Sequence, residues 1–165
     1  MRSLPRLLLI GISAVALASP GMSQRADDQI QPKSVALQSE AKTLIASGKL
    51  EQAEDVLETS LAVDPRNRGA FVDLARVAEK QHLYGKAIRL TNKALLLEPN
   101  DPDAIALQGE AMVEMGATAR AQENLQKLQS ICGAKGCPQV AQLSAAISRG
   151  PTVASAKAPD TPKKD

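Results

Sequence analysis

The chain repeats itself with a period of 34 residues, and this period restricts its fold more than any other feature. Pro65 and Pro99 lie 34 residues apart, and each follows an acidic residue at the end of an apolar run. Written in blocks of 34 from residue 34, the sequence aligns through three copies without insertion or deletion. The most regular column holds Ala53, Ala87 and Ala121. Residues 34–135 therefore contain three copies of one structural unit.

Each block predicts two antiparallel helices joined by a tight turn. Apolar residues recur at spacings of three and four in both halves of a block, which places them on one stripe of each helix. Gly48 suits the left-handed residue that ends a first helix. The proline pairs end the second helix, because the residue before proline is excluded from the α region. Such a unit exposes apolar surface until a neighbour stacks on it, so about three copies are the practical minimum.

The period and the column chemistry resemble the tetratricopeptide repeat family. The matching columns hold the alanines, the turn glycines Gly48 and Gly116, and the closing prolines Pro65 and Pro99. In the second repeat, His82 stands where the turn glycine is expected. The resemblance implies an all-α, right-handed solenoid whose helix-turn-helix repeats span 34–67, 68–101 and 102–135.

The segment after the third repeat predicts a capping helix. Pro138 suits a first helical turn, and Val140, Leu143 and Ile147 form one apolar edge. We expect a helix over about 138–148 that covers the last repeat. One small domain then spans 34–148.

The first 23 residues have the pattern of a secretory signal peptide. Arg2 and Arg6 precede an apolar run over 7–18, which is shorter than the roughly 20 residues that span a bilayer. Cleavage is expected between Ser23 and Gln24, or alternatively between Ala18 and Ser19. A retained membrane anchor is the other interpretation.

The two flanking segments are poor in apolar periodicity. Residues 24–33 are expected to form a flexible lead-in. Residues 149–165 consist mostly of proline, alanine, lysine and aspartate, and such a segment buries too little apolar surface to offset its chain entropy. We therefore expect a disordered tail.

Cys132 and Cys137 are the two cysteines, and four residues separate them. That spacing differs from the C-x-x-C of redox centres and from the C-x-x-C-H of haem attachment. A zinc site needs about four ligands, whereas the chain has two cysteines and one histidine. An exported chain favours a disulfide, with inert thiols or thiol redox chemistry as the alternatives.

Catalysis, cofactor binding and nucleic-acid binding have little support in the sequence. The net charge is +2, and the two aromatic residues Phe71 and Tyr84 cannot form a base-stacking platform. The single histidine, His82, falls in a predicted turn, and no nucleophile, phosphate-loop or metal motif is present. The chain is expected to be no enzyme and to use no metal or cofactor.

Helical-repeat arrays bind partners along the concave face that their first helices form. The columns that face this groove hold Gln38, Lys42, Ile45, Val72, Asp73, Arg76, Glu79, Leu107, Glu110 and Val113. They do not reproduce the Lys and Asn positions with which one subfamily grips a terminal carboxylate. A mixed groove around Arg76 suits a peptide with acidic and apolar side chains, and an ordinary solvated surface is the alternative.

The sequence therefore predicts an exported, non-enzymatic adaptor or scaffold in the bacterial cell envelope, most consistent with the periplasm of a Gram-negative organism. Its partner is expected to be a protein or peptide, with no nucleic acid and no membrane after signal cleavage. The alternatives are a membrane-tethered subunit of a larger envelope machine and a thiol-redox accessory protein.

Overall fold

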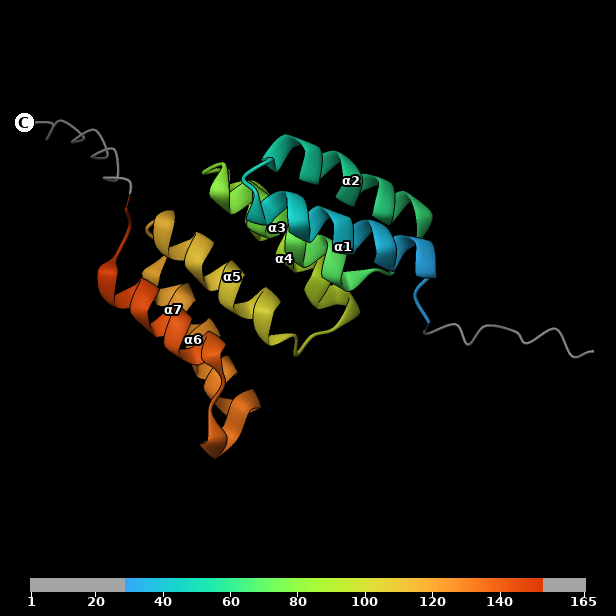
Figure 1. The fold of residues 1–165 in the computed structure, drawn as a ribbon. Coiled ribbons are helices and arrows are strands. Elements are labelled where there is room, and N and C mark those ends of the chain that lie inside the picture. Colours follow the sequence, from blue (N-terminus) through green and yellow to red (C-terminus); the bar gives the residue numbers. More distant parts are fainter. Residues whose placement is uncertain (1–28, 153–165) are drawn as a thin grey trace, which may run out of the picture.

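The computed structural model describes residues 29–152, which form seven α-helices and one short 3-10 helix. The predicted signal peptide and the residues after 152 lie outside this range. In chain order the helices are α1 Pro32–Ala46, α2 Leu50–Val63, α3 Arg68–Lys80, α4 Tyr84–Leu97, α5 Pro102–Glu114, α6 Thr118–Cys132, η1 Gly133–Lys135 and α7 Pro138–Arg149 (Figure 1).

The six longer helices pack as three consecutive helix pairs, α1 with α2, α3 with α4 and α5 with α6, and α7 adds a final helix (Figure 1). Helices α1, α3, α5 and α7 also contact one another in sequence, whereas α2, α4 and α6 make no such contacts among themselves. The first helices therefore lie on the inner, concave side of the stack. This arrangement confirms the all-α helical-repeat fold.

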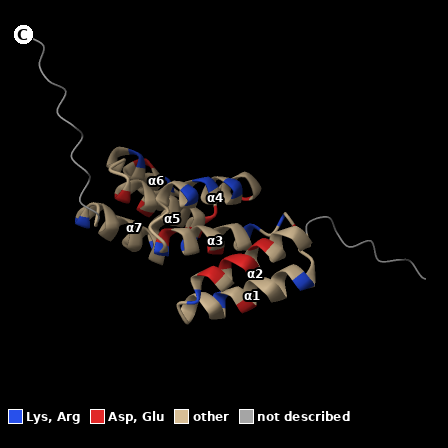
Figure 2. Cartoon of the chain, turned by 90° about the horizontal axis from the view of Figure 1, so that it is seen from above, with Lys and Arg blue, Asp and Glu red and all other residues tan. Residues whose placement is uncertain are grey.

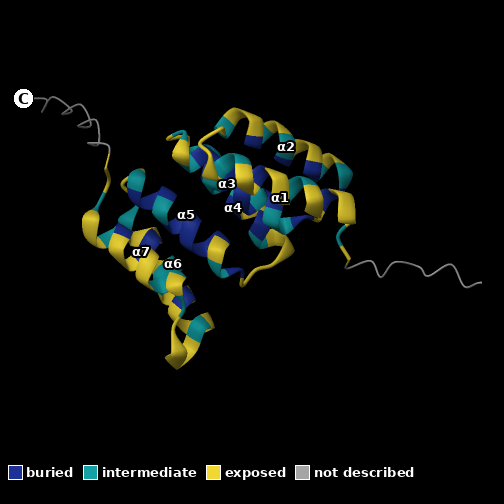
Figure 3. Cartoon of the chain, in the orientation of Figure 1, coloured by how far each residue is buried: buried dark blue, intermediate teal, exposed yellow. Residues whose placement is uncertain are grey.

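Small residues form the crossing points inside each pair, as the columns predict. Ala53, Ala87 and Ala121 are completely buried, and their methyl side chains allow the paired helices to approach closely. The largest buried side chains are mostly leucine and isoleucine, such as Leu57, Ile105 and Leu128. In Figure 3 the buried residues lie along the inner faces of the helices. Because the core contains mostly Ala, Leu and Val, it depends on close helix packing rather than on large aromatic side chains.

The turn inside each repeat has the same hydrogen-bonded geometry. Gly48, His82 and Gly116 all adopt positive φ, at 75°, 60° and 77°. The following residue donates back into the first helix each time, as when the Leu83 nitrogen bonds the Ala78 carbonyl at 2.8 Å. This is the glycine-terminated helix end expected from the sequence. His82 keeps it despite its Cβ, and its Nδ1 lies 2.9 Å from the Tyr84 hydroxyl.

The loops between repeats end one helix and cap the next. The residues before the two prolines, Asp64 and Glu98, are extended, as predicted. Asn67 and Asp101 then accept hydrogen bonds from the backbone nitrogens of the first turns of α3 and α5, at 3.1 and 2.8 Å. Asp101 also forms an ion pair with Arg68, which joins the starts of α3 and α5.

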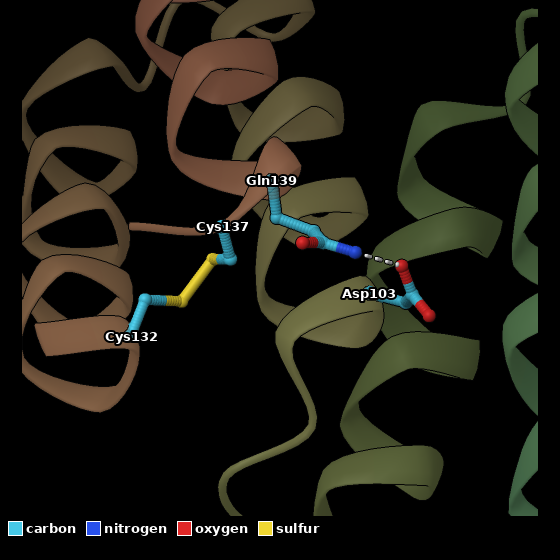
Figure 4. The surroundings of a disulfide bond; sticks show 4 residues. All are labelled: Asp103, Cys132, Cys137 and Gln139. Carbon is cyan, nitrogen blue, oxygen red and sulfur yellow. Dashed lines mark hydrogen bonds between the residues drawn. A yellow bond between two sulfur atoms is a disulfide. The ribbon is translucent and has the colours of Figure 1, made fainter. Parts of the chain in front are cut away.

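Helix α7 occupies the position that the first helix of a fourth repeat would take. It packs on both α5 and α6, and the fully buried Leu143 lies directly over Gly109. Cys132 at the end of α6 and Cys137 before α7 form a disulfide, with their Cα atoms 5.6 Å apart. Figure 4 shows this bond beside the hydrogen bond that Gln139 donates to Asp103, 2.7 Å long.

Both ends of the described chain are more ordered than the sequence indicates. Pro32 and Lys33 were assigned to the lead-in but belong to α1, and the Gln31 nitrogen donates to buried Asp64 at 2.9 Å. Arg149 was assigned to the tail but ends α7. Between residues 29 and 152, no helix combines the length and the apolar character needed to cross a membrane.

Removing the disulfide should lower the melting temperature by several degrees. Closing so short a loop contributes about 2 kcal/mol in the chain-entropy model, and 1 kcal/mol moves the melting temperature of a small domain by roughly 4 to 8 °C. Calorimetry of the double variant Cys132→Ser/Cys137→Ser against the oxidised protein measures the difference. Two thiols that react with a maleimide in the native, unreduced protein would contradict the pairing.

Candidate functional site

An open groove of about 410 Å³ lies on the concave face between α1 and α3. The sequence-predicted residues that line it are Gln38, Lys42, Ile45, Val72, Asp73 and Arg76. Sequence reasoning missed four further lining residues, Ala46, Arg68, Gly69 and Asp103. The groove therefore combines an apolar wall with several charged side chains.

Asp73 is the electrostatic centre of the groove. Its carboxylate is 8% exposed, accepts a hydrogen bond from the Gln38 amide at 2.8 Å, and lies 3.8 Å from the Lys42 ammonium. The Arg76 Nε lies 4.0 Å from the other carboxylate oxygen. Lys42 and Arg76 remain 60% and 38% exposed. Two exposed cations thus share one buried anion, which leaves one positive charge in excess.

A glycine at position 69 creates the narrow part of the groove. A Cβ built on Gly69 would lie 2.5 Å from Nε2 of Gln38, so a larger residue here would displace this amide from its present path to Asp73. The corresponding columns in the neighbouring repeats hold Val35 and Asp103. A glycine in a column that otherwise holds larger residues was the sequence signal for the close approach of α1 and α3.

Two predicted groove residues on α5 are corrected by the structure. Leu107 is 2% exposed and packs in the core formed with α3 and α4, and Val113 is 1% exposed and packs near Ile147 of α7. Neither can contact a partner. The repeat columns give α5 the same inner face as α1, but α5 is an internal helix with α3 on one side and α7 on the other.

The two remaining predicted residues, Glu79 and Glu110, belong to an acidic cluster outside the groove lining. Burial and the facing Glu110 carboxylate raise the pKa of Glu79 to about 7, and Glu114 adds to the effect. Burial likewise raises the pKa of Glu110, whereas Gln142 and the guanidinium groups of Arg76 and Arg149 oppose it. Figure 2 shows the acidic and basic residues along these helices.

The Glu79–Glu110 contact makes stability depend on pH. The folded protein binds a proton at Glu79 below about pH 7, whereas an unperturbed glutamate binds it near 4.5. Stability should therefore rise as the pH falls from about 8 to about 5. Carboxylates with lowered pKa values, such as Asp64, act in the opposite direction only below about pH 4.

Melting curves across this pH range measure the effect, and Glu79→Gln is the matched variant. It should be more stable than wild type at about pH 8 and should lose most of the pH dependence. An unchanged pH profile in Glu79→Gln would assign the dependence to other groups.

Buried polar side chains join the helices behind the groove, and hydrophobic periodicity gave no sign of them. The Ser34 hydroxyl donates to the Ser60 carbonyl at 2.8 Å, and the Asn67 amide donates to Ser34 at 2.9 Å. These bonds fix α1, α2 and the start of α3 relative to one another. Across residues 29–152, no group of three or more His, Cys, Asp and Glu side chains is arranged to hold a metal ion.

The comparisons with known proteins agree with this geometry. The family model for the tetratricopeptide repeat matches residues 44–111, from the end of α1 into α5. The seven helices described above are packed as tetratricopeptide helix-turn-helix repeats, and solved domains of that type share the arrangement.

Two curated relatives are cellulose synthase operon proteins. Cellulose synthase operon protein C of Pseudomonas fluorescens (strain SBW25) is 30% identical over 135 residues, which cover 81% of this chain and 10% of that protein. Cellulose synthase 2 operon protein C of Komagataeibacter xylinus is 38% identical over 73 residues, which cover 43% of this chain and 5% of that protein. This chain therefore spans about a tenth or less of the length of these relatives.

Three solved structures show the same fold. The Sgt2 TPR domain from Aspergillus fumigatus has a TM-score of 0.66 at 22% identity, covering 72% of this chain and 79% of that one. The first TPR of Spaghetti (RPAP3), bound to the HSP90 peptide SRMEEVD, has a TM-score of 0.64 at 17% identity, with coverages of 71% and 91%. The Yersinia enterocolitica type III secretion chaperone SycD, with a peptide of the translocator YopD, has a TM-score of 0.61 at 23% identity, with coverages of 70% and 86%.

Proposed function

We propose that this tetratricopeptide repeat protein is a non-enzymatic adaptor that binds a segment of a partner protein in the groove between α1 and α3. The open groove of about 410 Å³ carries this proposal, because it is concave and combines apolar and charged lining residues. Two proteins of the same fold hold peptides, the first TPR of Spaghetti and SycD. Glu79 and Glu110 extend the proposed binding surface beyond the groove.

The partner segment carries an acidic side chain next to an apolar one. Lys42 and Arg76 carry two positive charges and share the single carboxylate of Asp73. An acidic side chain of the partner would neutralise the remaining positive charge. Val72 and Ile45 provide the apolar wall beside this position. The acid supplies orientation and the apolar contact supplies buried area.

The protein acts in the cell envelope, in the periplasm of a Gram-negative bacterium. The basic start and short apolar run of residues 1–23 support export, and the disulfide fits an oxidising compartment. The similarity to cellulose synthase operon proteins suggests a role as one part of a larger assembly. Mass spectrometry of the mature protein tests this, because a chain that begins at Gln24 or Ser19 was cleaved.

Two alternatives make distinct predictions. A membrane-tethered subunit of a larger machine would retain residues 1–23 and sediment with membranes after washing at high salt. A thiol-redox accessory protein would exchange its Cys132–Cys137 disulfide with dithiols in repeated cycles. The adaptor does neither, and its binding persists in the double serine variant.

Photo-crosslinking in the native host tests the adaptor function directly. A photoreactive amino acid placed at Ile45 faces the groove, and the same residue placed at Gln122 lies on exposed α6. The partner should be captured from position 45 and not from position 122. Equal capture from both positions would place the binding surface elsewhere.

Removing the charge of Arg76 should abolish capture of the partner, while the melting temperature stays near that of wild type. Arg76→Gln is preferable to charge reversal, because a glutamate at this position would face Asp73 and Glu79 at close range. Lys93 is an unsuitable control, because its ammonium lies 5.6 Å from the centre of the Phe71 ring. Arg120→Gln, an exposed change on α6, should bind like wild type. Full capture by Arg76→Gln would remove the acidic-partner proposal.

A further inference from the structure

A second hollow, of about 500 Å³, lies where α3 turns into α4. Leu83 and Met115 line it, and they are 47% and 58% exposed although both are large and apolar. The rings of His82 and Tyr84 also line it and pack edge to face, with their centroids 5.9 Å apart. Its lining residues differ from those of the groove between α1 and α3. The hollow is therefore a separate feature of the surface.

The first repeat has the same hollow in a polar form. Residues 48–52 and Gln81 line a space of about 360 Å³ at the equivalent turn. There Lys49 and Gln81 occupy the columns that hold Leu83 and Met115 one repeat later. The repeat thus folds with polar side chains at both positions. Packing of the repeat does not explain why Leu83 and Met115 are apolar.

The outer helix of the middle repeat also differs in charge from its neighbours. Helix α2 contains four acidic and no basic residues, whereas α4 contains three basic and no acidic residues (Figure 2). Arg89 lines the hollow, and its column holds Asp55 and Glu123 in the other two repeats. Lys86 forms an ion pair with Glu54 of α2, but Arg89 has no such partner in the part of the chain that the structure describes. Arg89 therefore leaves a positive charge beside the hollow.

This surface continues along α4. Lys93 and Leu96 follow Arg89 at helical positions i+4 and i+7, which places the three side chains on one face. All three are exposed, and Leu96 reaches 83%. The column of Leu96 holds Ala62 and Ser130 in the other repeats. The outer face of α4 thus has exposed apolar side chains at both ends and two cations between them.

The charge of α4 argues against two other occupants. A second copy that met this face with its own α4 would bring three basic residues against the same three. The acidic helix α2 of a second copy presents no large exposed apolar side chain that could fill the hollow. Anionic membranes recruit clusters of about four to eight basic residues, whereas Arg89 and Lys93 are two.

We propose that the outer face of α4 is a second docking surface, which binds an acidic segment of another protein. An aliphatic side chain of that segment fills the hollow at Leu83 and Met115, and its carboxylates pair with Arg89 and Lys93. Four helical residues separate the two cations, about 6 Å along the axis, and two residues of extended chain span this distance. The expected pattern in the partner is therefore Leu-x-Glu-x-Glu. The flexible thioether of Met115 adapts to different aliphatic groups.

Methionine methyl groups provide the readout for a binding experiment. Met115 lines the hollow, and Met112 is buried one turn earlier and serves as an internal control. In full-length protein labelled with ¹³C at these methyl groups, acetyl-Leu-Ala-Glu-Ala-Glu-amide at millimolar concentration should shift the Met115 signal saturably and leave the Met112 signal in place. The peptides acetyl-Leu-Ala-Lys-Ala-Lys-amide and acetyl-Ala-Ala-Glu-Ala-Glu-amide should each give a several-fold smaller shift.

Two matched variants place residues of the first repeat in the second. Leu83→Lys should remove the Met115 shift, because the hollow then has a charged wall. Arg89→Asp should reverse the preference from the glutamate peptide to the lysine peptide. Both variants should melt near the wild-type temperature, since Lys49 and Asp55 occupy the same columns in a folded repeat.

Three results of the peptide titrations would each overturn the proposal: no Met115 shift with any peptide, equal shifts with the acidic and basic peptides, or an unchanged response in both variants. A Met115 signal that moves with protein concentration alone would assign the hollow to a second copy instead. An equal shift with phosphatidylglycerol vesicles would assign it to a membrane. Photo-capture from position 45 reports on the groove alone, so failure of the adaptor function there and failure of this second surface can be told apart.

Discussion

Replacing Leu143 by alanine is expected to lower the free energy of unfolding by about 3 kcal/mol, within the range for fully buried leucines. Leu143 has no exposed surface and packs in one cluster with Ile105, Ala106 and Leu128, against which Val140 and Ile147 of α7 also pack. Its loss leaves a cavity at the last interface of the stack. The melting temperature should fall by roughly 12 °C or more, measured by circular dichroism at 222 nm. Ser144→Ala, an exposed change on the same helix, should have little effect.

The Leu143 side chain also determines what residue 109 can be. A Cβ on Gly109 would lie 2.6 Å from a methyl carbon of Leu143, so Gly109→Ala should destabilise the wild-type protein. In the Leu143→Ala background the added methyl group has no leucine side chain to clash with. Alanine is then favoured over glycine in the helix by about 1 kcal/mol. We therefore expect Gly109→Ala to lower the free energy of unfolding in the wild-type background and to raise it in the Leu143→Ala background. The same sign in both would show that α7 does not pack on α5 through this pair.

Replacing Asp101 by alanine should cost about 2 kcal/mol. Its carboxylate caps α5 through the Ala104 nitrogen at 2.8 Å, and helix caps typically contribute about 1 kcal/mol. The same buried side chain forms the ion pair with Arg68, which is 43% exposed and partly solvated, so breaking that pair costs less than it would in a dry core. Urea unfolding measures the sum.

Asp101→Asn separates the two contributions. The amide oxygen can still cap α5, while the charge that pairs with Arg68 is removed, so this variant should lose about half as much stability as Asp101→Ala. Equal losses for the two variants would assign the whole effect to the ion pair. A loss under about 0.5 kcal/mol for Asp101→Ala would contradict both roles.

The repeat columns predicted the fold because they report backbone geometry and burial, which recur in every copy. The alanine column marked the helix crossings, and Gly48 and Gly116 marked the left-handed turns. Asp64 and Glu98 lie before prolines and are extended for a local reason. The boundary at Pro32 was missed because Asp64 holds Gln31 from 33 residues away, and no local pattern contains that contact.

The groove was less predictable than the fold, because its lining depends on residues that differ between the three repeats. Of the predicted residues on α1 and α3, all but Glu79 line the groove, whereas Leu107 and Val113 are buried because α7 converts α5 into an internal helix. Gly69 and Asp103 share a column with Val35, and three such different residues predict no common role for that column. The sharing of Asp73 by Lys42 and Arg76 is a three-dimensional contact between repeats.

The pattern of helix contacts also determines how the chain folds. Each described α-helix touches only the next two α-helices along the sequence, and no contact between elements closes a longer loop. The mean sequence separation of contacts is therefore small, and such topologies fold in microseconds to milliseconds. No single pair must form first, so folding can start at any repeat and propagate to its neighbours. The pair α1–α2 and the capping helix α7 each have neighbours on one side only, but the disulfide ties α7 to α6. We therefore expect the α1–α2 pair to open first under native conditions, together with the half of the groove that α1 provides.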